Sequence, residues 1–408
     1  MSWKTCTLDE CISLRSGSTP SKQNPSFWNG TIPWASSKEL KQLRLYNTES
    51  RVTQEAIKSA SSVIDKGTVL IVVRGMVLAK EFPVSIAQVT MTFNQDLKAV
   101  DPKGTAIDRS FLPYLLLGHR EGLRSLADEA AHGTKRIQTD RLLAYKVELP
   151  SPEVQKRIAS ILSAYDDLIE NNTRRIEVLE EMARRLYEEW FVQFRFPGHE
   201  DAVFEKMTIN NVADVVRGRS YRSAELVEEG RPFVNLKCVN RDGGYRRDGL
   251  KYYSGKYKPE QLVTSGDIIM AVTDMTQERR IVARVALVPD LGEQEGVISM
   301  DLVRIVPKSG VPPLYLYAFF RWSDFADNVK NHATGANVLH LHPDLIVNYD
   351  INLPPQEVCK LFAEKVRPAI ELVDVLEKKN ANLRAQRDLL LPKLISGEID
   401  VSDIPMPT

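Results

Sequence analysis

The residues best suited to chemistry lie between positions 217 and 258, a stretch that is both basic and rich in tyrosine. It holds eleven Lys or Arg residues against five Asp or Glu, with five tyrosines interleaved. Arg and Lys contact phosphates or guanine edges, and Asn can read adenine. A charged surface of strand and turn explains any single residue equally well, but the stretch as a whole favours nucleic acid. The candidate contacts are Arg217, Arg219, Tyr221, Asn235, Lys237, Asn240 and Arg246.

The first half of the chain carries a second, less basic set of polar residues. For each of these residues an ordinary surface role is somewhat the better explanation, because they are scattered along the sequence. As a group they supply hydroxyls and cations of the kind that contact a nucleic acid backbone. The candidates are Thr19, Ser21, Lys22, Ser36, Ser37, Lys38, Arg74, Lys135 and Arg136.

Other groupings that could support catalysis or bind a metal do not form a complete site. No glycine-rich cofactor motif follows a predicted strand. His340 and His342 could lie on one side of a strand, but a metal site needs further ligands, and Cys238 is the only remote candidate. Acidic pairs such as Asp166-Asp167 and Glu180-Glu181 lie in a stretch where acids and arginines recur four residues apart, which is typical of a solvated helix flank. We therefore expect no catalytic residue, no metal and no cofactor in this chain.

The elements that must position the candidate residues occur twice. The sequence at 149–154 returns at 353–358, an offset of 204 residues in a chain of 408. From each copy onward, apolar residues recur at alternating steps of four and three, an average spacing that is typical of a coiled-coil seam. Two seams in one chain most simply bury each other.

Each helix follows a stretch of about 150 residues, which is an ordinary domain size. Apolar runs behind Gly67 and Gly266 read as buried strands, and residues 111–127 and 314–329 have helical spacing. We predict a mixed α+β protein with two similar small α/β domains, joined by two long helices that pack as an antiparallel coiled coil with a pseudo-two-fold repeat. The expected boundaries are 1–148 for the first head, 149–198 for its helical spacer, 199–352 for the second head, 353–397 for the second spacer, and 398–408 for a tail.

Each seam contains an asparagine near its middle. Asn172 is the fifth of ten seam positions in the first helix, and Asn380 is the sixth of ten in the second. In an antiparallel pair these positions face each other, and burying an unpaired amide costs ~1–3 kcal/mol, so we expect the two asparagines to meet. Pro368 is expected to kink the second helix. The residues assigned to helix pairing are Asn172, Asn380, Ile169, Ile176, Leu376 and Leu383.

Composition limits the remaining possibilities. The chain has 54 basic and 54 acidic residues, which argues against binding of polyanions by the whole surface but allows local basic patches. No apolar run approaches the ~20 residues of a membrane span, and the start lacks the hydrophobic core of a signal peptide. The four cysteines are scattered. Together these features predict a protein of the reducing cytoplasm, without a membrane partner.

Several segments, in this order, resemble those of a known family. They are Gly17-Ser18-Thr19-Pro20-Ser21-Lys22 followed by the segment Trp28 to Trp34, then Asn94-Gln95-Asp96, and the helix ends at 186–192 and 389–397. With the duplication, the chain resembles over essentially its whole length the specificity subunit of type I restriction–modification systems. The second head has Arg219-Ser220-Tyr221-Arg222 in place of the Thr-Pro-Ser-Lys pattern, so contacts are not transferred from one head to the other.

The resemblance implies a non-catalytic subunit whose heads each read one half of a bipartite double-stranded DNA target. It also implies that the helices set the gap between the halves and hold two modification subunits, which supply S-adenosylmethionine and methylate adenine at N6. Restriction subunits would add ATP- and Mg-dependent translocation and cleavage. Two alternatives stay open: an enzyme with its own methyltransferase or nuclease site, and a two-headed structural scaffold that does not bind DNA.

Overall fold

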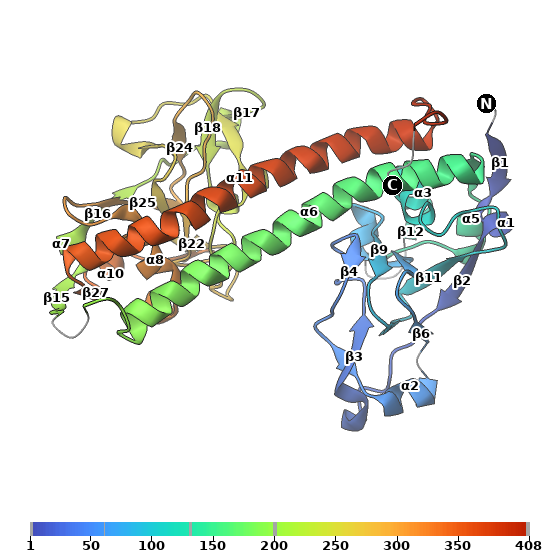
Figure 1. The fold of residues 1–408 in the computed structure, drawn as a ribbon, viewed down its shortest axis with the longest axis horizontal. Helices are drawn as coiled ribbons and strands as arrows, with labels where there is room; N and C mark the ends of the chain where they lie inside the picture. Colours follow the sequence, from blue (N-terminus) through green and yellow to red (C-terminus); the bar gives the residue numbers. More distant parts are fainter. Residues whose placement is uncertain (1–2, 61, 130–132, 199–201, 405–408) are drawn as a thin grey trace. The chain divides into compact units, whose positions relative to one another are not determined.

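The computed structural model describes residues 3–60, 62–129, 133–198 and 202–404, and the chain divides into two compact units. Unit 1 comprises Met1–Asn171 with Asn380–Thr408, and unit 2 comprises Asn172–Lys379. Each unit therefore combines one globular head with one half of each long helix. These helices are α6 (Pro152–Tyr187), which continues as a short π-helical turn to Val192, and α11 (Gln356–Ile395) (Figure 1).

In its described residues, head 1 has four small sheets and five short α-helices. β1 (Lys4–Thr7) pairs with β14 (Lys146–Leu149), which brings the two ends of the head together. A five-stranded sheet has the order β2 (Ile12–Ser16), β11 (Leu97–Pro102), β7 (Val69–Val72), β9 (Val84–Ala87), β4 (Arg44–Leu45). A four-stranded sheet has the order β5 (Arg51–Val52), β3 (Trp28–Ala35), β10 (Met91–Phe93), β6 (Val63–Ile64), and a three-stranded sheet the order β12 (Asp128–Glu129), β13 (Lys135–Arg136), β8 (Arg74–Gly75). The helices are α1 (Leu8–Cys11), α2 (Gln54–Ala60), α3 (Leu112–Gly118), α4 (Arg120–Ser125) and α5 (Thr139–Leu143).

Head 2 repeats this arrangement. β15 (Glu205–Thr208) pairs with β27 (Asp350–Leu353), as β1 pairs with β14. The larger sheets have the orders β16 (Ala213–Arg217), β25 (Leu302–Pro307), β21 (Ile268–Ala271), β23 (Val285–Leu287) and β17 (Leu226–Val227), β19 (Lys251–Tyr253), β18 (Arg231–Val234), β24 (Gly296–Ile298), β20 (Leu262–Val263). β22 (Thr273–Asp274) pairs with β26 (Leu339–His340), and the helices are α7 (Ile209–Val212), α8 (Pro313–Trp322), α9 (Phe325–Val329) and α10 (Asp344–Val347).

The two heads agree in detail. In head 1 the parallel pair β3–β10 aligns Trp34 with Thr92, and in head 2 the parallel pair β18–β24 aligns Phe233 with Val297. The strands predicted behind Gly67 and Gly266 are β7 and β21, each with four buried residues. The duplication read from the sequence is therefore a duplication of structure.

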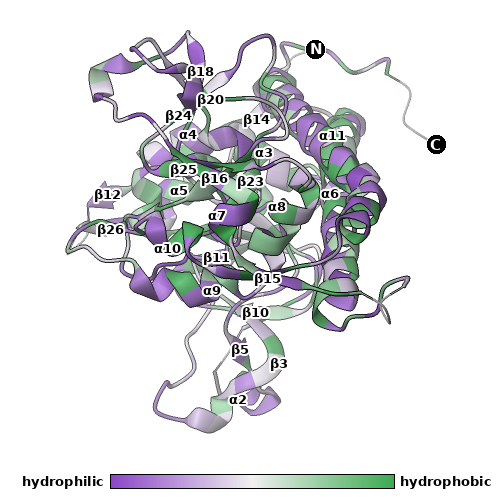
Figure 2. Ribbon diagram, turned by 90° about the vertical axis from the view of Figure 1, so that its left-hand side faces the viewer, coloured by the Kyte–Doolittle hydropathy of each residue, from purple (hydrophilic) through white to green (hydrophobic). Residues whose placement is uncertain are grey.

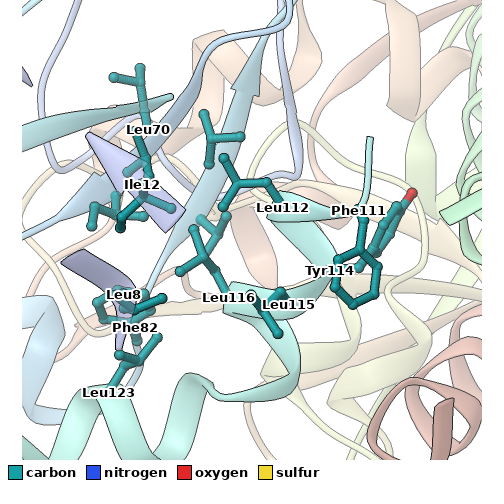
Figure 3. Packing of buried hydrophobic residues seen from close by; sticks show 14 of the residues in the cluster. Leu8, Ile12, Leu70, Phe82, Phe111, Leu112, Tyr114, Leu115, Leu116 and Leu123 are labelled. Atoms are coloured by element: carbon teal, nitrogen blue, oxygen red, sulfur yellow. The ribbon is translucent and has the colours of Figure 1, made fainter. Parts of the chain in front are cut away.

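The core of head 1 lies between its sheets and helix α3, and it extends onto the long helices of the same unit. Leu8, Leu70 and Leu115 are fully buried in it, together with Phe111 and Leu112 (Figure 3). Ile158 and Leu162 of α6 and Leu394 of α11 belong to the same cluster. Each head thus uses its spacer helices as part of its own core.

The long helices run antiparallel in each unit. In unit 1, Ile169 of α6 contacts Asn380 of α11, and Asp166 contacts Arg387, so residue numbers rise on one helix while they fall on the other. In unit 2, the ring of Tyr187, at the end of α6, lies 6.2 Å from the ring of Phe362 on α11. The ring of Trp190, on the π-helical turn that follows α6, lies 6.0 Å from the same ring. Both helices mix hydrophilic and hydrophobic residues along their length, as a seam with solvated flanks requires (Figure 2).

Helix α11 runs without a break from Gln356 to Ile395, and Pro368 and Pro392 both lie inside it. Pro368 is exposed, and the kink expected there stays a prediction. In the helices that the structure describes, no segment is long and apolar enough to cross a membrane.

Candidate nucleic-acid interface

In head 1, two tryptophans hold the loop that carries Thr19, Ser21 and Lys22. The indole N–H of Trp34 donates to the Ser18 carbonyl at 3.1 Å, and that of Trp28 donates to the Ser21 carbonyl at 3.1 Å. The two rings pack edge to face with centroids 5.2 Å apart, a favourable aromatic geometry. The polar loop and the aromatic residues that follow it in the sequence therefore form one local unit.

A glycine begins this loop in each head because the backbone passes close to a neighbouring strand end. A Cβ on Gly17 would lie 2.2 Å from the Phe93 carbonyl oxygen, and one on Gly218 would lie 2.0 Å from the Ser299 carbonyl oxygen. The residue after each glycine is bound in the same way: Ser18 N donates to Phe93 O at 2.9 Å, and Arg219 N donates to Ile298 O at 2.7 Å. Only glycine fits such an approach.

The turn Asn94-Gln95-Asp96 joins the other segments of the site. Thr19 Oγ1 donates to Gln95 Oε1 at 2.6 Å. The Asp96 carbonyl accepts from the backbone N–H of Val73 at 2.9 Å and of Arg74 at 3.2 Å. This turn, which sequence analysis singled out only by resemblance, places the loop of Thr19 beside the strand of Arg74.

Strand pairing adds the remaining basic residues of head 1. β13 aligns Arg136 with Arg74 and Lys135 with Gly75 of β8. Ser37 lies next to this pair, since its Oγ is 3.6 Å from the place that a Cβ on Gly75 would occupy. The structure therefore brings together residues from four separate segments of the chain: Thr19, Ser37, Arg74, and Lys135 with Arg136.

Other candidates of head 1 are already engaged or stand apart. Ser36 N donates to Glu39 Oε2 at 3.0 Å, and the Ser36 hydroxyl bonds the same carboxylate. Lys38 Nζ lies 2.6 Å from Glu49 Oε2, and this hydrogen bond raises the pKa of the lysine. Ser21 and Lys22 are exposed on the loop. Among these residues only Lys22 offers a cation to an outside partner without breaking an ion pair.

Head 2 has the same framework but different side chains at the corresponding place. β26 aligns His340 with Thr273 of β22, as β13 aligns Arg136 with Arg74. The Asp301 carbonyl accepts from Val272 N at 2.9 Å, as Asp96 O accepts from Val73 N. Thr273 is fully buried, and its Oγ1 donates to Asp301 Oδ1 at 3.0 Å. Sequence analysis did not select Thr273 as a candidate, because its place in the site depends on strand register.

The basic candidates of head 2 fall into two groups. Arg217 and Lys237 are exposed, and neither forms an ion pair with a residue in the described parts of the chain. Arg219 is half-buried, whereas Arg246 binds Asp248 through Nε at 2.7 Å and Nη2 at 3.1 Å. Among these four residues, Arg217 and Lys237 are therefore the exposed cations that form no ion pair in the described parts of the chain.

The two remaining polar candidates of head 2 have local structural contacts. Tyr221 packs edge to face on Phe233 at 4.8 Å, and burial raises the pKa of its phenol. Asn240 Nδ2 donates to the Tyr245 carbonyl at 3.2 Å. Both contacts hold the surface of head 2 in shape.

Asn235 was predicted to contact DNA, but this prediction is wrong because its amide is bound inside head 2. Its side chain is buried, with 5% exposed, and Nδ2 donates to the Gly249 carbonyl at 2.8 Å. Its Oδ1 accepts from Lys237 N at 3.0 Å, which caps the short 3-10 helix at Leu236–Cys238. The amide has no free group with which to read adenine, so Asn235 supports the fold of head 2.

The acidic pairs of α6 are partly as predicted. Arg185 binds Glu181 and Arg184 binds Glu188 one turn apart on the helix surface. Asp166 is the exception: it is buried, with 6% exposed, and joins helices α3, α6 and α11. A solvated flank is therefore the wrong description for Asp166.

Two arginines that sequence analysis missed anchor each head to a long helix in its own unit. Arg44 on β4 forms ion pairs with Asp167 and Glu170 on α6. Arg247 forms an ion pair with Asp374 on α11, 3.8 Å from Glu377 as well. The offset from Glu170 to Asp374 is 374 − 170 = 204, which equals the sequence repeat. An arginine gives no sign in the sequence of an ion-pair partner that lies more than 100 residues away.

Within the described residues, no group of three or more His, Cys, Asp or Glu side chains is placed to hold a metal ion. The sites of the two heads consist of hydroxyls, amides and guanidinium groups presented at strand ends and turns. Such groups suit hydrogen bonding to base edges and phosphates.

Comparison with known proteins agrees with this arrangement. The sequence model of the type I restriction modification DNA specificity domain matches residues 1–181. The MjaIX specificity subunit of Methanocaldococcus jannaschii, a type I restriction enzyme component, is 25% identical over 427 aligned residues, which cover 98% of this chain and 94% of that protein. Residues 1–181 therefore match the DNA specificity domain of type I restriction–modification systems, and almost the whole chain is similar to a specificity subunit of such a system.

Two further specificity subunits are similar to this chain, one in sequence and one in fold. The EcoR124I/EcoR124II specificity subunit of Escherichia coli is 32% identical over 202 residues, or 48% of this chain and 49% of that protein. The crystal structure of the type I S subunit from M. genitalium superposes with a TM-score of 0.60 at 16% identity, covering 96% of both chains. The two-headed fold is therefore shared with a solved specificity subunit.

Proposed function

We propose that this chain is the DNA-recognition subunit of a type I restriction–modification complex and carries no catalytic site itself. Each head reads one half of a bipartite double-stranded DNA target. The long helices set the distance between the halves and hold two modification subunits. Those subunits bind S-adenosylmethionine and methylate adenine at N6, and restriction subunits, where they join, use ATP and Mg for translocation and cleavage.

One observation carries this proposal: the two heads have the same framework but present different side chains at the same place. Arg74 and Arg136 occupy the β8–β13 pair of head 1, where head 2 has Thr273 and His340. A repeated framework supports two reading sites of one kind. Different side chains on it support two different half-sequences, because base contacts specify sequence while phosphate contacts position the protein.

The helices are suited to act as a spacer. Helix α6 has 36 residues and α11 has 40, and in each unit they pack antiparallel around shared apolar positions. Arg44 and Arg247 bind carboxylates on the helix that follows their own head. A head that is bound to a stiff helix cannot easily change its distance from the other head. We therefore expect a fixed gap between the two half-sites.

Mapping methylated adenines in a host genome tests the proposal. The chain is expressed together with its modification subunit, and the host with the modification subunit alone is the control. The expected result is methylation at one bipartite motif with a fixed gap, seen only when both chains are present. Methylation without this chain, or a continuous unsplit motif, would contradict the proposal.

A further inference from the structure

We propose that head 1 selects a guanine through the adjacent arginines Arg74 and Arg136, and that head 2 reads its half-site without such a pair. The inference rests on the DNA-reading function proposed above and adds the class of base that one head recognises.

The two arginines lie directly beside each other on the surface of head 1. Arg74 and Arg136 are direct partners across the antiparallel pair β8–β13, and both are exposed. Directly opposite residues on such a pair have Cβ atoms ~4.5–5.5 Å apart on one face, and like charges in this position are destabilising. An arrangement that costs stability in the free protein is favourable when a ligand accepts hydrogen bonds from both groups.

The acidic side chains near the two arginines are bound to other residues. Asp128 is aligned with Arg136 on the other side of β13, but its carboxylate oxygens lie 2.7 and 2.8 Å from Arg141 Nη1. Glu129 binds Lys135, with 3.1 Å between Oε1 and Nζ. Neither Arg74 nor Arg136 forms an ion pair with any residue in the described ranges of the chain.

A third acid, on the turn beside Arg74, is also occupied. The Asp96 carboxylate accepts from Asn94 Nδ2 at 3.1 Å. The two guanidinium groups are thus left free on the surface of head 1.

The backbone that presents them is fixed. Arg74 N donates to Asp96 O at 3.2 Å, and Ile137 N, next to Arg136, donates to Val73 O at 2.9 Å. A planar guanidinium on a rigid backbone suits bidentate bonding, which in DNA means O6 and N7 of guanine in the major groove.

The corresponding strand pair of head 2 has no arginine at either position. Thr273 is buried against Asp301, and His340 is the exposed member of the pair. A guanine contact of the same kind cannot form there. The two halves of the target are therefore expected to differ in this respect.

The test uses the full chain assembled with its modification subunits and duplexes that carry the mapped bipartite motif. Each guanine of the head 1 half is replaced in turn by 7-deazaguanine, which lacks the N7 acceptor. The unmodified complex should lose about 5- to 150-fold in affinity at one position, the range expected for a bidentate contact.

Variants assign that loss to the arginines. Arg74→Gln or Arg136→Gln should bind more weakly and show little further loss with 7-deazaguanine at the sensitive position. Arg74→Lys and Arg136→Lys keep the charge but not the planar fork, and because Lys can also contact a guanine edge they should weaken the preference less than the Gln variants do. The matched control is Arg120→Gln, an exposed arginine on α4 of the same head, which should keep the full sensitivity. Thermal unfolding of each variant checks that head 1 remains folded.

The outcomes distinguish failure of the guanine assignment from failure of the proposed DNA-recognition function. If the Lys variants bind like the unmodified chain and the Gln variants weaken equally for all sequences, the arginines contact phosphate and the guanine assignment is wrong. It is also wrong if the 7-deazaguanine effect persists in the Gln variants, or if the head 1 half contains no guanine. Absence of any sequence-specific binding by the unmodified complex would instead overturn the proposed function.

Discussion

Arg387 on α11 donates from Nη1 to the carboxylate of Asp166 on α6, 2.6 Å away. The second Asp166 oxygen accepts from the hydroxyl of Tyr114 on α3 at 2.8 Å, so one buried carboxylate joins three elements of unit 1. The positions offset by 204 residues from this pair hold Ile370 and Ala183, which are packed in the apolar core of unit 2. The two long helices are therefore joined by a polar contact in unit 1, where the matching positions of unit 2 are apolar. We call the contact of Asp166 with Arg387 and Tyr114 the polar joint.

Removing Arg387 alone should strongly destabilise the protein. Arg387→Met leaves a buried carboxylate without its cation, and loss of one partner of a buried pair costs about 3 kcal/mol or more. The double variant Asp166→Leu with Arg387→Met should recover much of this loss, because apolar residues serve at the matching place in unit 2. Urea unfolding measures both, and Arg384→Met, exposed on the same helix, is the control. An Arg387→Met variant as stable as the control would show that the joint has no structural weight.

The exposed cations Arg217 and Lys237 of head 2 should contribute to DNA affinity. Arg217→Ala and Lys237→Ala should each weaken binding, either uniformly with a salt slope smaller by about one, or by ~1–3 kcal/mol at a single base position. Binding to sequence-varied duplexes at several salt concentrations distinguishes a phosphate contact from a base contact. Lys365→Ala on α11 removes an exposed lysine outside the heads and should have no such effect. If none of the changes matters, the DNA face of head 2 lies elsewhere.

The features that could be predicted from the sequence are the duplicated heads and the helices with periodic apolar residues. The 204-residue offset and the 4-3 spacing predicted two heads and two packed helices, because burial of apolar residues follows directly from their spacing. The positions of Asn172 and Asn380 in the seams favoured the antiparallel direction. It could not show that Arg74 and Arg136 are neighbours, since 62 positions separate them and strand register decides the contact. Nor could it show that the Asn235 amide is consumed inside the fold, because an asparagine that caps a turn and one that reads a base look alike in sequence.

Lengthening the helices should lengthen the DNA gap. One added heptad in both α6 and α11 keeps the seam in phase and extends each helix by ~10 Å at ~1.5 Å per residue. At ~3.4 Å per base pair this corresponds to about three base pairs. Binding to duplexes with varied gaps should shift to a longer gap, or fail because the heads now meet different sides of the duplex. An added segment of four residues, which breaks the phase, is the control. Unchanged preference for the original gap would refute a rigid spacer.

The asparagines of the two seams should depend on each other. Asn380 is buried, and its Nδ2 donates to the Ile169 carbonyl at 3.3 Å, while Asn172 is half-buried. The pairing of their amides stays a prediction. Asn172→Leu and Asn380→Leu should each cost ~1–3 kcal/mol, because one amide is left without its partner. The double variant should regain stability while loosening the register of the helices. Unfolding free energies that simply add would argue against the pairing.

Independent reading by two heads is the central claim, and exchange of one head tests it most directly. Residues 1–148 are replaced by the corresponding head of another specificity subunit, and methylated adenines are mapped in a host that also carries the modification subunit. The account predicts a hybrid motif in which one half-sequence changes while the other half stays as before. A motif in which both halves change together, or in which neither changes, would contradict it.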